Sequence, residues 1–154
     1  MEMLGLLPRD ADYVSFCVVR NPYDRALSSV IHFTKAEWTN SENDEERRVG
    51  FELDLESWLN RPIEDHNMRA HRRAQIDFVR NRKGEVVVNH ILRFETLAED
   101  FLALGEHLGW TGINIKRVGD SGRRKSYQDF YSERSKKMVE ECFGDDCEAF
   151  GFNY

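Results

Sequence analysis

The junction between a short apolar run and the residues Arg20, Asn21 and Pro22 most restricts how this chain can fold. Residues 13–19 are almost entirely apolar, without polar alternation, which is typical of a parallel strand buried on both faces. Asn21 is a favourable N-cap residue, and proline is favoured at the first helical position. The sequence therefore predicts a strand that turns directly into a helix, which we expect to run to about Trp38.

Helices and strands alternate along the next part of the chain. The acidic stretch 39–50 predicts an exposed loop, and a short helix is predicted after it, up to Pro62. Residues 64–80 are predicted as helix, and the apolar residues 86–88 and 91–94 as one or two strands. Such alternation predicts an α/β fold with a mainly parallel sheet flanked by helices.

Two further helices are predicted in the C-terminal half. Thr96 and Glu99 are spaced as a capping box, and Gly109 ends the helix that follows them. A last helix is expected over residues 132–143, closed by Gly144.

The composition excludes several classes of protein. With 154 residues, 40% of them hydrophobic, the chain is expected to form one domain, residues 1–154, with its own core. No segment reaches the roughly 20 apolar residues of a membrane helix. A net charge of −6 argues against nucleic-acid binding. The three cysteines are spaced neither as metal ligands nor as a disulfide framework, which favours a cytoplasmic protein without a metal site.

The strand-to-helix junction also predicts a phosphate site. Arg20 closes the strand at the carboxyl edge of the sheet, where ligands bind in open α/β folds. A helix N-terminus attracts anions, and a guanidinium can bind phosphate with two hydrogen bonds. Arg25 and Ser28 share one face of the helix, so Arg20 and a helix hydroxyl can hold one phosphate. The alternative is that Arg20 pairs with Asp24 and that Ser28 is an ordinary helix residue.

The same segment resembles the 3′-phosphate-binding motif of sulfotransferases, which use 3′-phosphoadenosine 5′-phosphosulfate as donor. In that family an arginine closes a strand and a serine follows eight positions later, and Arg20 and Ser28 have this spacing. The form of the motif is most similar to the carbohydrate-type branch. Three further stretches resemble motifs of that branch in the same order, namely residues 71–78, 91–97 and 126–152.

The resemblance implies a P-loop-NTPase-like sulfotransferase fold. It implies sulfuryl transfer to a hydroxyl or amine of a carbohydrate or small-molecule acceptor, with adenosine 3′,5′-bisphosphate as product and without a metal. The loop before the C-terminal motif is expected to close over the nucleotide through Arg123, Arg124, Lys125 and Tyr127, beside the residues Arg20, Arg25 and Ser28. The alternative for the three basic loop residues is a solvated loop.

Acceptor binding is predicted on the helix expected before the second strand, which the resemblance places beside the acceptor cleft. Its candidates are His66, His71, Arg72 and Gln75. A polar surface is the alternative role of the histidines, and pairing with the acidic segment 37–56 is the alternative for Arg72. No residue is assigned as the catalytic base.

The family's first strand and its loop for the 5′-phosphosulfate have no counterpart before Phe16, so the fold is expected to be N-terminally truncated relative to the family. Three interpretations stay open. The chain is part of such an enzyme, or it is completed by another chain or a second copy, or it is a non-catalytic nucleotide- or partner-binding module on a degenerate scaffold.

Overall fold

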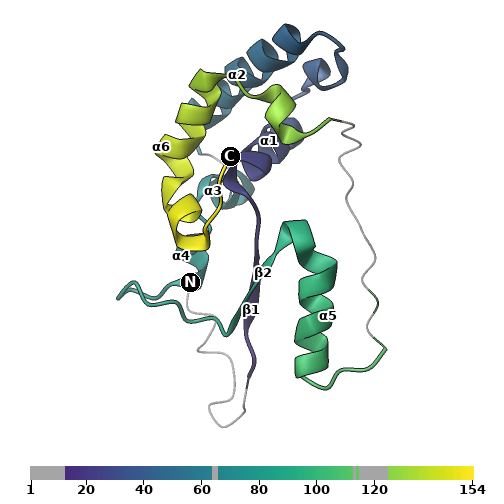
Figure 1. Cartoon of the computed structure of the whole chain (residues 1–154). Helices are drawn as coiled ribbons and strands as arrows, with labels where there is room; N and C mark the ends of the chain where they lie inside the picture. The colour runs from purple at the N-terminus through teal and green to yellow at the C-terminus, as the bar shows by residue number, and fades with distance from the viewer. Residues whose placement is uncertain (1–12, 64–65, 113, 115–124) are drawn as a thin grey trace.

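The computed structural model describes residues 13–63, 66–112, 114 and 125–154, and within them the protein has two parallel strands and six α-helices. The α/β class predicted from the sequence is confirmed. The elements in chain order, with η for short 3-10 helices, are β1 (Phe16–Val19), α1 (Pro22–Phe33), η2 (Glu37–Asn40), α2 (Asp44–Asn60), α3 (His66–Arg72), α4 (Ile76–Val79), β2 (His90–Arg93), η3 (Phe94–Thr96), α5 (Leu97–His107), η4 (Tyr127–Phe130) and α6 (Glu133–Phe150). In Figure 1, α1, α2 and α6 gather at one end, and the strands lead from them towards α5.

The strand-to-helix junction forms as the sequence predicts, but the expected burial of the strand on both faces is wrong, because Phe16 and Val18 are 42% and 43% exposed in the two-stranded sheet that the described residues form. β1 and β2 pair in parallel, and α1 begins at Pro22, directly after the turn that ends β1. The Asn21 side chain caps the helix by accepting a hydrogen bond from Tyr23 N–H at 3.0 Å. The helix ends at Phe33, earlier than expected, because Thr34 adopts an extended conformation with φ of −123° and ψ of 170°.

The prediction of an exposed loop over residues 39–50 is wrong, because α2 begins inside it at Asp44. The Asn43 side chain accepts hydrogen bonds from the N–H groups of Glu45 and Glu46, at 3.0 and 3.3 Å. The acidic first turn also suits the positive end of the helix dipole. The helix then buries an apolar face made of Phe51, Leu55 and Trp58.

The helix expected over residues 64–80 is interrupted. Two separate helices, α3 and α4, occupy this stretch, and the break falls just before Ile76. Residues 86–88 form no strand, contrary to the prediction, and the structure describes only an isolated antiparallel bridge between Arg80 and Val86 there. Val86 and Val87 are about half exposed, and only Val88 of the three packs against the smaller apolar cluster, so this stretch has little buried surface to stabilise a strand.

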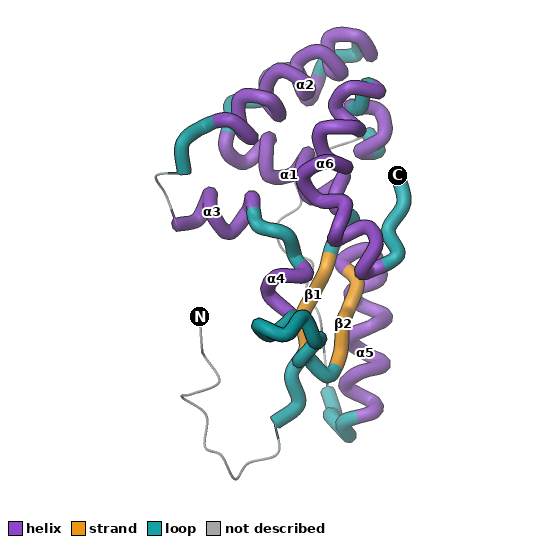
Figure 2. Tube along the Cα trace, turned by 90° about the vertical axis from the view of Figure 1, so that its left-hand side faces the viewer, coloured by secondary structure: helices purple, strands orange, loops and turns teal. Residues whose placement is uncertain are grey.

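The capping box expected at Thr96 and Glu99 is wrong. The Thr96 hydroxyl donates to Asp100 Oδ1 at 3.1 Å, and its side chain caps no backbone N–H group. The helix nevertheless forms as α5 and ends before Gly109, whose φ of 70° suits glycine. Figure 2 shows α5 lying along β2.

α6 runs further than predicted. Phe143 leaves the helical region at φ −133° and ψ 19°, where the end was expected, but the helix resumes and continues to Phe150. Gly151, with φ of 65°, then ends it. The additional length carries Asp146 into the interior, where its side chain has no solvent exposure.

Two apolar clusters form the core. The larger cluster lies between α1, α2 and α6 and includes Leu27, Phe51 and Val139. The smaller cluster joins the end of β1 to α4 and to the C-terminal segment through Val19, Val79 and Phe152. Val19, the last residue of β1, therefore connects the sheet to α4 and to the C-terminal segment.

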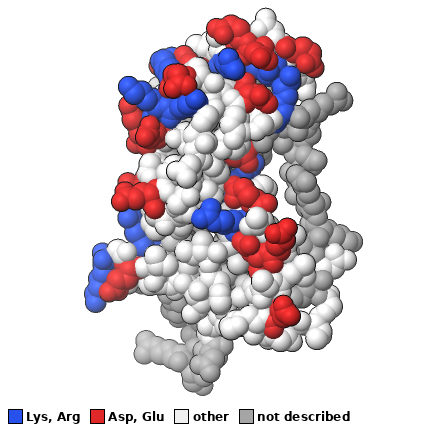
Figure 3. Space-filling view, viewed as in Figure 1, with Lys and Arg blue, Asp and Glu red and all other residues white. Residues whose placement is uncertain are grey.

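Charged side chains of both signs lie next to each other on the surface over α2 and α6 (Figure 3). Arg134, for example, pairs with Glu52 at 2.7 Å and with Glu56 at 2.9 Å. None of the helices that the structure describes is long and apolar enough to cross a bilayer.

We expect Gly50→Ala and Gly144→Ala to change the free energy of unfolding in opposite directions. A Cβ on Gly50 would lie 2.5–2.7 Å from Trp38 atoms, so alanine should destabilise by about 1–3 kcal/mol despite its helix propensity. A Cβ on Gly144 meets nothing within 4 Å, so alanine should stabilise by about 0.5–1 kcal/mol. Urea denaturation of both variants measures this. Equal effects would contradict the close packing of α2 on η2.

Candidate functional site

The turn between β1 and α1 is held by side chains and backbone from three distant segments. Arg20 N–H donates to Gln75 Oε1 at 2.9 Å, and Asn21 N–H donates to Glu95 Oε1 at 2.7 Å. Asn21 Nδ2 donates to the carbonyl of Asn153 at 2.8 Å. These contacts fix the backbone at the carboxyl end of β1, the edge at which ligands bind in open α/β sheets.

The Arg20 guanidinium lies along the start of α1. Its Nε and Nη2 contact Asp24 Oδ2 at 2.7 and 2.6 Å, and its Cζ lies 4.4 Å from the centroid of the Phe94 ring. This ion pair is the alternative that the sequence left open for Arg20. The two side chains are 22% and 12% exposed and Asp24 is a buried residue, so the pair is largely shielded from solvent, although it belongs to neither apolar cluster. None of the hydrogen bonds among the described residues uses Nη1 of Arg20.

Ser28 follows Asp24 on the same face of α1, because four residues make about one helical turn. Ser28 is half-buried, and its hydroxyl forms no hydrogen bond with the residues that the structure describes. Arg20, Asp24 and Ser28 thus line one face, which we call the Arg20 rim. A carboxylate lies between the two groups predicted to hold phosphate.

The Arg25 guanidinium contacts backbone carbonyls and a buried carboxylate. Its Nη2 donates to the carbonyls of His71 at 3.0 Å and Arg73 at 2.6 Å, and its Nη1 lies 3.4 Å from Asp146 Oδ2. Burial lowers the pKa of Arg25, and the Asp146 carboxylate opposes that effect. These contacts occupy the guanidinium that was predicted to bind nucleotide, and they hold the end of α3 against α1.

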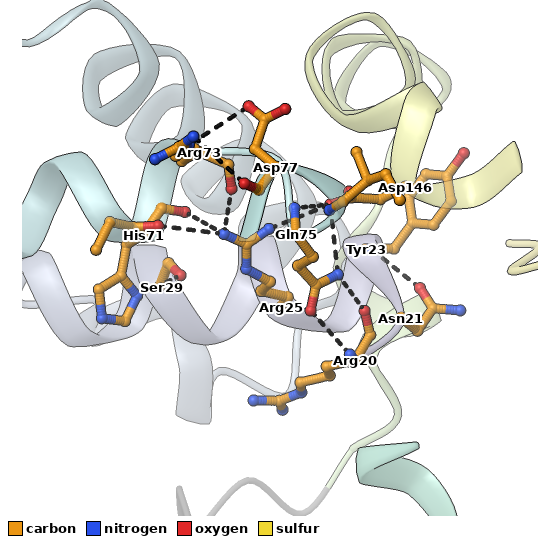
Figure 4. Close-up of polar contacts among 12 residues, drawn as sticks. Arg20, Asn21, Tyr23, Arg25, Ser29, His71, Arg73, Gln75, Asp77 and Asp146 are labelled. Carbon is orange, nitrogen blue, oxygen red and sulfur yellow. Dashed lines mark hydrogen bonds and ion pairs between the residues drawn. The ribbon is translucent and has the colours of Figure 1, made fainter. Parts of the chain in front are cut away.

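Gln75, predicted for acceptor binding, has its side-chain amide on the backbone of Arg20 (Figure 4). Its own N–H donates to Asp146 Oδ2 at 2.8 Å, and Ile76 N–H donates to Asp146 Oδ1 at 2.9 Å. The buried carboxylate therefore caps the start of α4 from α6. Sequence reasoning missed Asp146, because no local pattern connects it with residues 70 positions away.

The other three predicted acceptor residues have different surroundings and do not form one site. His66 is exposed at the start of α3. His71 Nδ1 lies 3.1 Å from Ser29 Oγ on α1, and its ring stacks on His32. Arg72 donates to two carbonyls at the end of α2.

The loop predicted to close over the nucleotide is described only in part. Arg123 and Arg124 lie outside the described residues. Lys125 Nζ lies 3.3 Å from Glu42 Oε2, an ion pair that joins the loop to the segment before α2.

Tyr127 lies at the turn that bears Arg20. Its hydroxyl accepts a hydrogen bond from Asn21 Nδ2 at 3.4 Å, and its ring meets the Tyr154 ring edge-on at 5.9 Å. Burial is the main cause that raises the pKa of Tyr127. The start of η4 is therefore packed next to the start of α1, as a loop closing on the turn requires.

Two surface pockets, of about 500 and 410 Å³, lie between α2 and α6, and neither includes Arg20 or Ser28. In the part of the chain that the structure describes, no group of three or more His, Cys, Asp or Glu side chains is placed to hold a metal ion. We therefore take the Arg20 rim as the candidate site, because it contains the residues of the sequence motif and has a guanidinium at the carboxyl end of β1.

A parallel strand with an arginine at its carboxyl end, followed by a capped helix, defines an α/β protein whose turn has the groups that an anion site requires. The chain belongs to the sulfotransferase family, whose model matches residues 8–153. Neither the curated proteins nor the solved structures gave a match. The family in general uses 3′-phosphoadenosine 5′-phosphosulfate as donor, so membership implies a donor and an acceptor.

We expect acid to destabilise the protein through His71. Burial, followed by His32 and Arg25, lowers the pKa of His71 below its ordinary 6.5. The folded chain therefore binds this proton less readily than the unfolded chain, so stability falls as the pH drops below that value. His71→Gln should lose less Tm than wild type between about pH 7 and pH 5. The exposed His66 serves as control, and a His66→Gln variant with the same benefit would contradict the assignment.

Proposed function

We propose that the protein transfers a sulfuryl group from 3′-phosphoadenosine 5′-phosphosulfate to a hydroxyl or amine of a carbohydrate or small-molecule acceptor, and that Arg20 and Ser28 bind the 3′-phosphate. Family membership supports the class of reaction. The observation that carries the site is the Arg20 guanidinium, which lies along the face of α1 that also bears Ser28.

The chemistry of the Arg20 rim fits a phosphate group. A guanidinium has five N–H donors, and the ion pair with Asp24 uses Nε and Nη2 of Arg20. The remaining donors, together with the Ser28 hydroxyl, can bind phosphate oxygens while the Phe94 ring supports the guanidinium.

These residues bind and orient the nucleotide, and the nucleotide supplies the sulfuryl group. Transfer of labelled sulfate from the donor to a hydroxyl or amine acceptor by the purified chain tests the reaction itself.

We expect Arg20→Ala to abolish most of the preference for adenosine 3′,5′-bisphosphate over adenosine 5′-monophosphate. The variant loses charge-assisted hydrogen bonds to the 3′-phosphate, so affinity for the bisphosphate should fall about 10–100-fold. Affinity for the monophosphate should not change. Calorimetry with both nucleotides measures the two affinities.

The matched control is Arg82→Ala, which removes one exposed arginine from the turn after α4. It should leave the preference as in wild type. Equal binding of the two nucleotides by wild type, or no binding of either, would overturn the proposed role of Arg20 and Ser28.

We expect Asp24→Asn to bind the bisphosphate more tightly. The carboxylate lies between Arg20 and Ser28 and repels a phosphate on the same helix face. Its replacement by a neutral amide of the same shape should raise affinity about 3–10-fold at low salt. Calorimetry at two salt concentrations tests this, since the gain should shrink with added salt. A loss of affinity would show that no such repulsion limits binding.

A further inference from the structure

We propose that Gln75 is a positioning residue for Arg20, and that the buried Asp146 carboxylate fixes Gln75 for this task. The inference rests on the proposed function, because it assigns a role to residues that hold the phosphate-binding arginine. Both residues lie outside the strand-to-helix motif and are distant from it in the sequence.

Gln75 satisfies both backbone polar groups of Arg20. Its Oε1 accepts from Arg20 N–H at 2.9 Å, and its Nε2 donates to the Arg20 carbonyl at 2.8 Å. The side-chain amide therefore takes the place of a neighbouring strand at the residue that follows β1. Fixing both peptide groups around one Cα sets the direction in which the Arg20 side chain leaves the backbone.

Asp146 fixes the position of Gln75 through its carboxylate oxygens. Asp146 Oδ2 accepts from Gln75 N–H at 2.8 Å and lies 3.4 Å from Gln75 Nε2, and Oδ1 accepts from Ile76 N–H at 2.9 Å. The Arg25 guanidinium lies 3.4 Å from the same carboxylate, which has no solvent exposure. Because a buried charge needs all of these donors, the Asp146 carboxylate and the groups that contact it have little freedom to move.

The contacts of Gln75 indicate a positioning role in addition to a stabilising one. The amide makes two hydrogen bonds to the Arg20 backbone and lies against the Asp146 carboxylate, and the rotamer freedom that the side chain loses offsets part of their gain. Removal of the amide leaves the Arg20 N–H and carbonyl without these partners, which costs stability, and it also removes the constraint on where the Arg20 side chain lies. Small displacements of a binding group are costly for recognition.

The test compares Gln75→Met with wild type and with Gln128→Met. Methionine keeps the length of glutamine but offers Arg20 no hydrogen-bonding amide. Gln128→Met makes the same change at the other, exposed glutamine of the chain. For each protein, calorimetry gives the affinities for adenosine 3′,5′-bisphosphate and adenosine 5′-monophosphate, and a thermal melt gives Tm.

Gln75→Met should lose about tenfold in the preference for the bisphosphate, with monophosphate affinity within about twofold of wild type. Its Tm should fall by a few degrees, because the N–H and carbonyl of Arg20 lose their partners. Hydrogen exchange at Arg20 N–H should accelerate in the free variant, because its acceptor is gone. Gln128→Met should match wild type in each measurement.

Three other results overturn the inference. If Gln75→Met keeps the wild-type preference, Gln75 does not position Arg20. If affinities for both nucleotides fall by one factor together with Tm, the role is structural only. If wild type itself shows no preference, the proposed phosphate site fails, and the inference falls with it.

Discussion

A carboxylate with no solvent contact, Asp146, is the constraint on which the site depends. Removing an ionised group from water costs several kcal/mol unless charges and hydrogen-bond donors replace the solvent. Here the donors come from α1, through Arg25, and from the break before α4, through Gln75 and Ile76. The requirement to satisfy one buried charge thereby joins three segments that share no local sequence pattern, and it brings α4 beside the end of β1.

Two arginines five positions apart on this junction differ in what they can do. The Arg25 guanidinium is surrounded by carbonyl groups at the end of α3 and by one buried carboxylate, and burial lowers its pKa. An anion could reach Arg25 only by displacing contacts that hold two helices together. Arg20 instead contacts one carboxylate and one ring at the rim. Their side chains are similarly exposed, at 22% for Arg20 and 16% for Arg25, so the contacts that each makes, and not burial, separate the structural arginine from the one proposed to bind a ligand.

The local parts of the fold could be predicted from the sequence, and the contacts between distant segments could not. The Asn21 cap and the proline at the helix start are determined by neighbouring residues, and they form as expected. The strand also forms, but without the burial on both faces that its apolar residues predict. The sequence does contain a signal for the start of α2, since Asn43 precedes an acidic first turn, but the many charged residues favoured the prediction of a loop. Gln75 could be recognised as part of a family motif, yet its contact with Arg20 depends on Asp146, 71 positions further along the chain.

The ion pair between Arg20 and Asp24 affects anion binding in two opposing ways. The carboxylate holds the guanidinium extended along α1, so the side chain is already directed toward the face that bears Ser28. This lowers the entropy lost when a ligand binds. The same carboxylate repels a phosphate, and the pair is largely shielded from solvent, with side chains 22% and 12% exposed, so it cannot be treated as an exposed surface ion pair. A phosphate must therefore supply charge-assisted hydrogen bonds, at about 1.5–3 kcal/mol each, that compensate for the repulsion. Pre-orientation and repulsion act on the same guanidinium, and the balance between them determines how tightly the Arg20 rim can bind an anion.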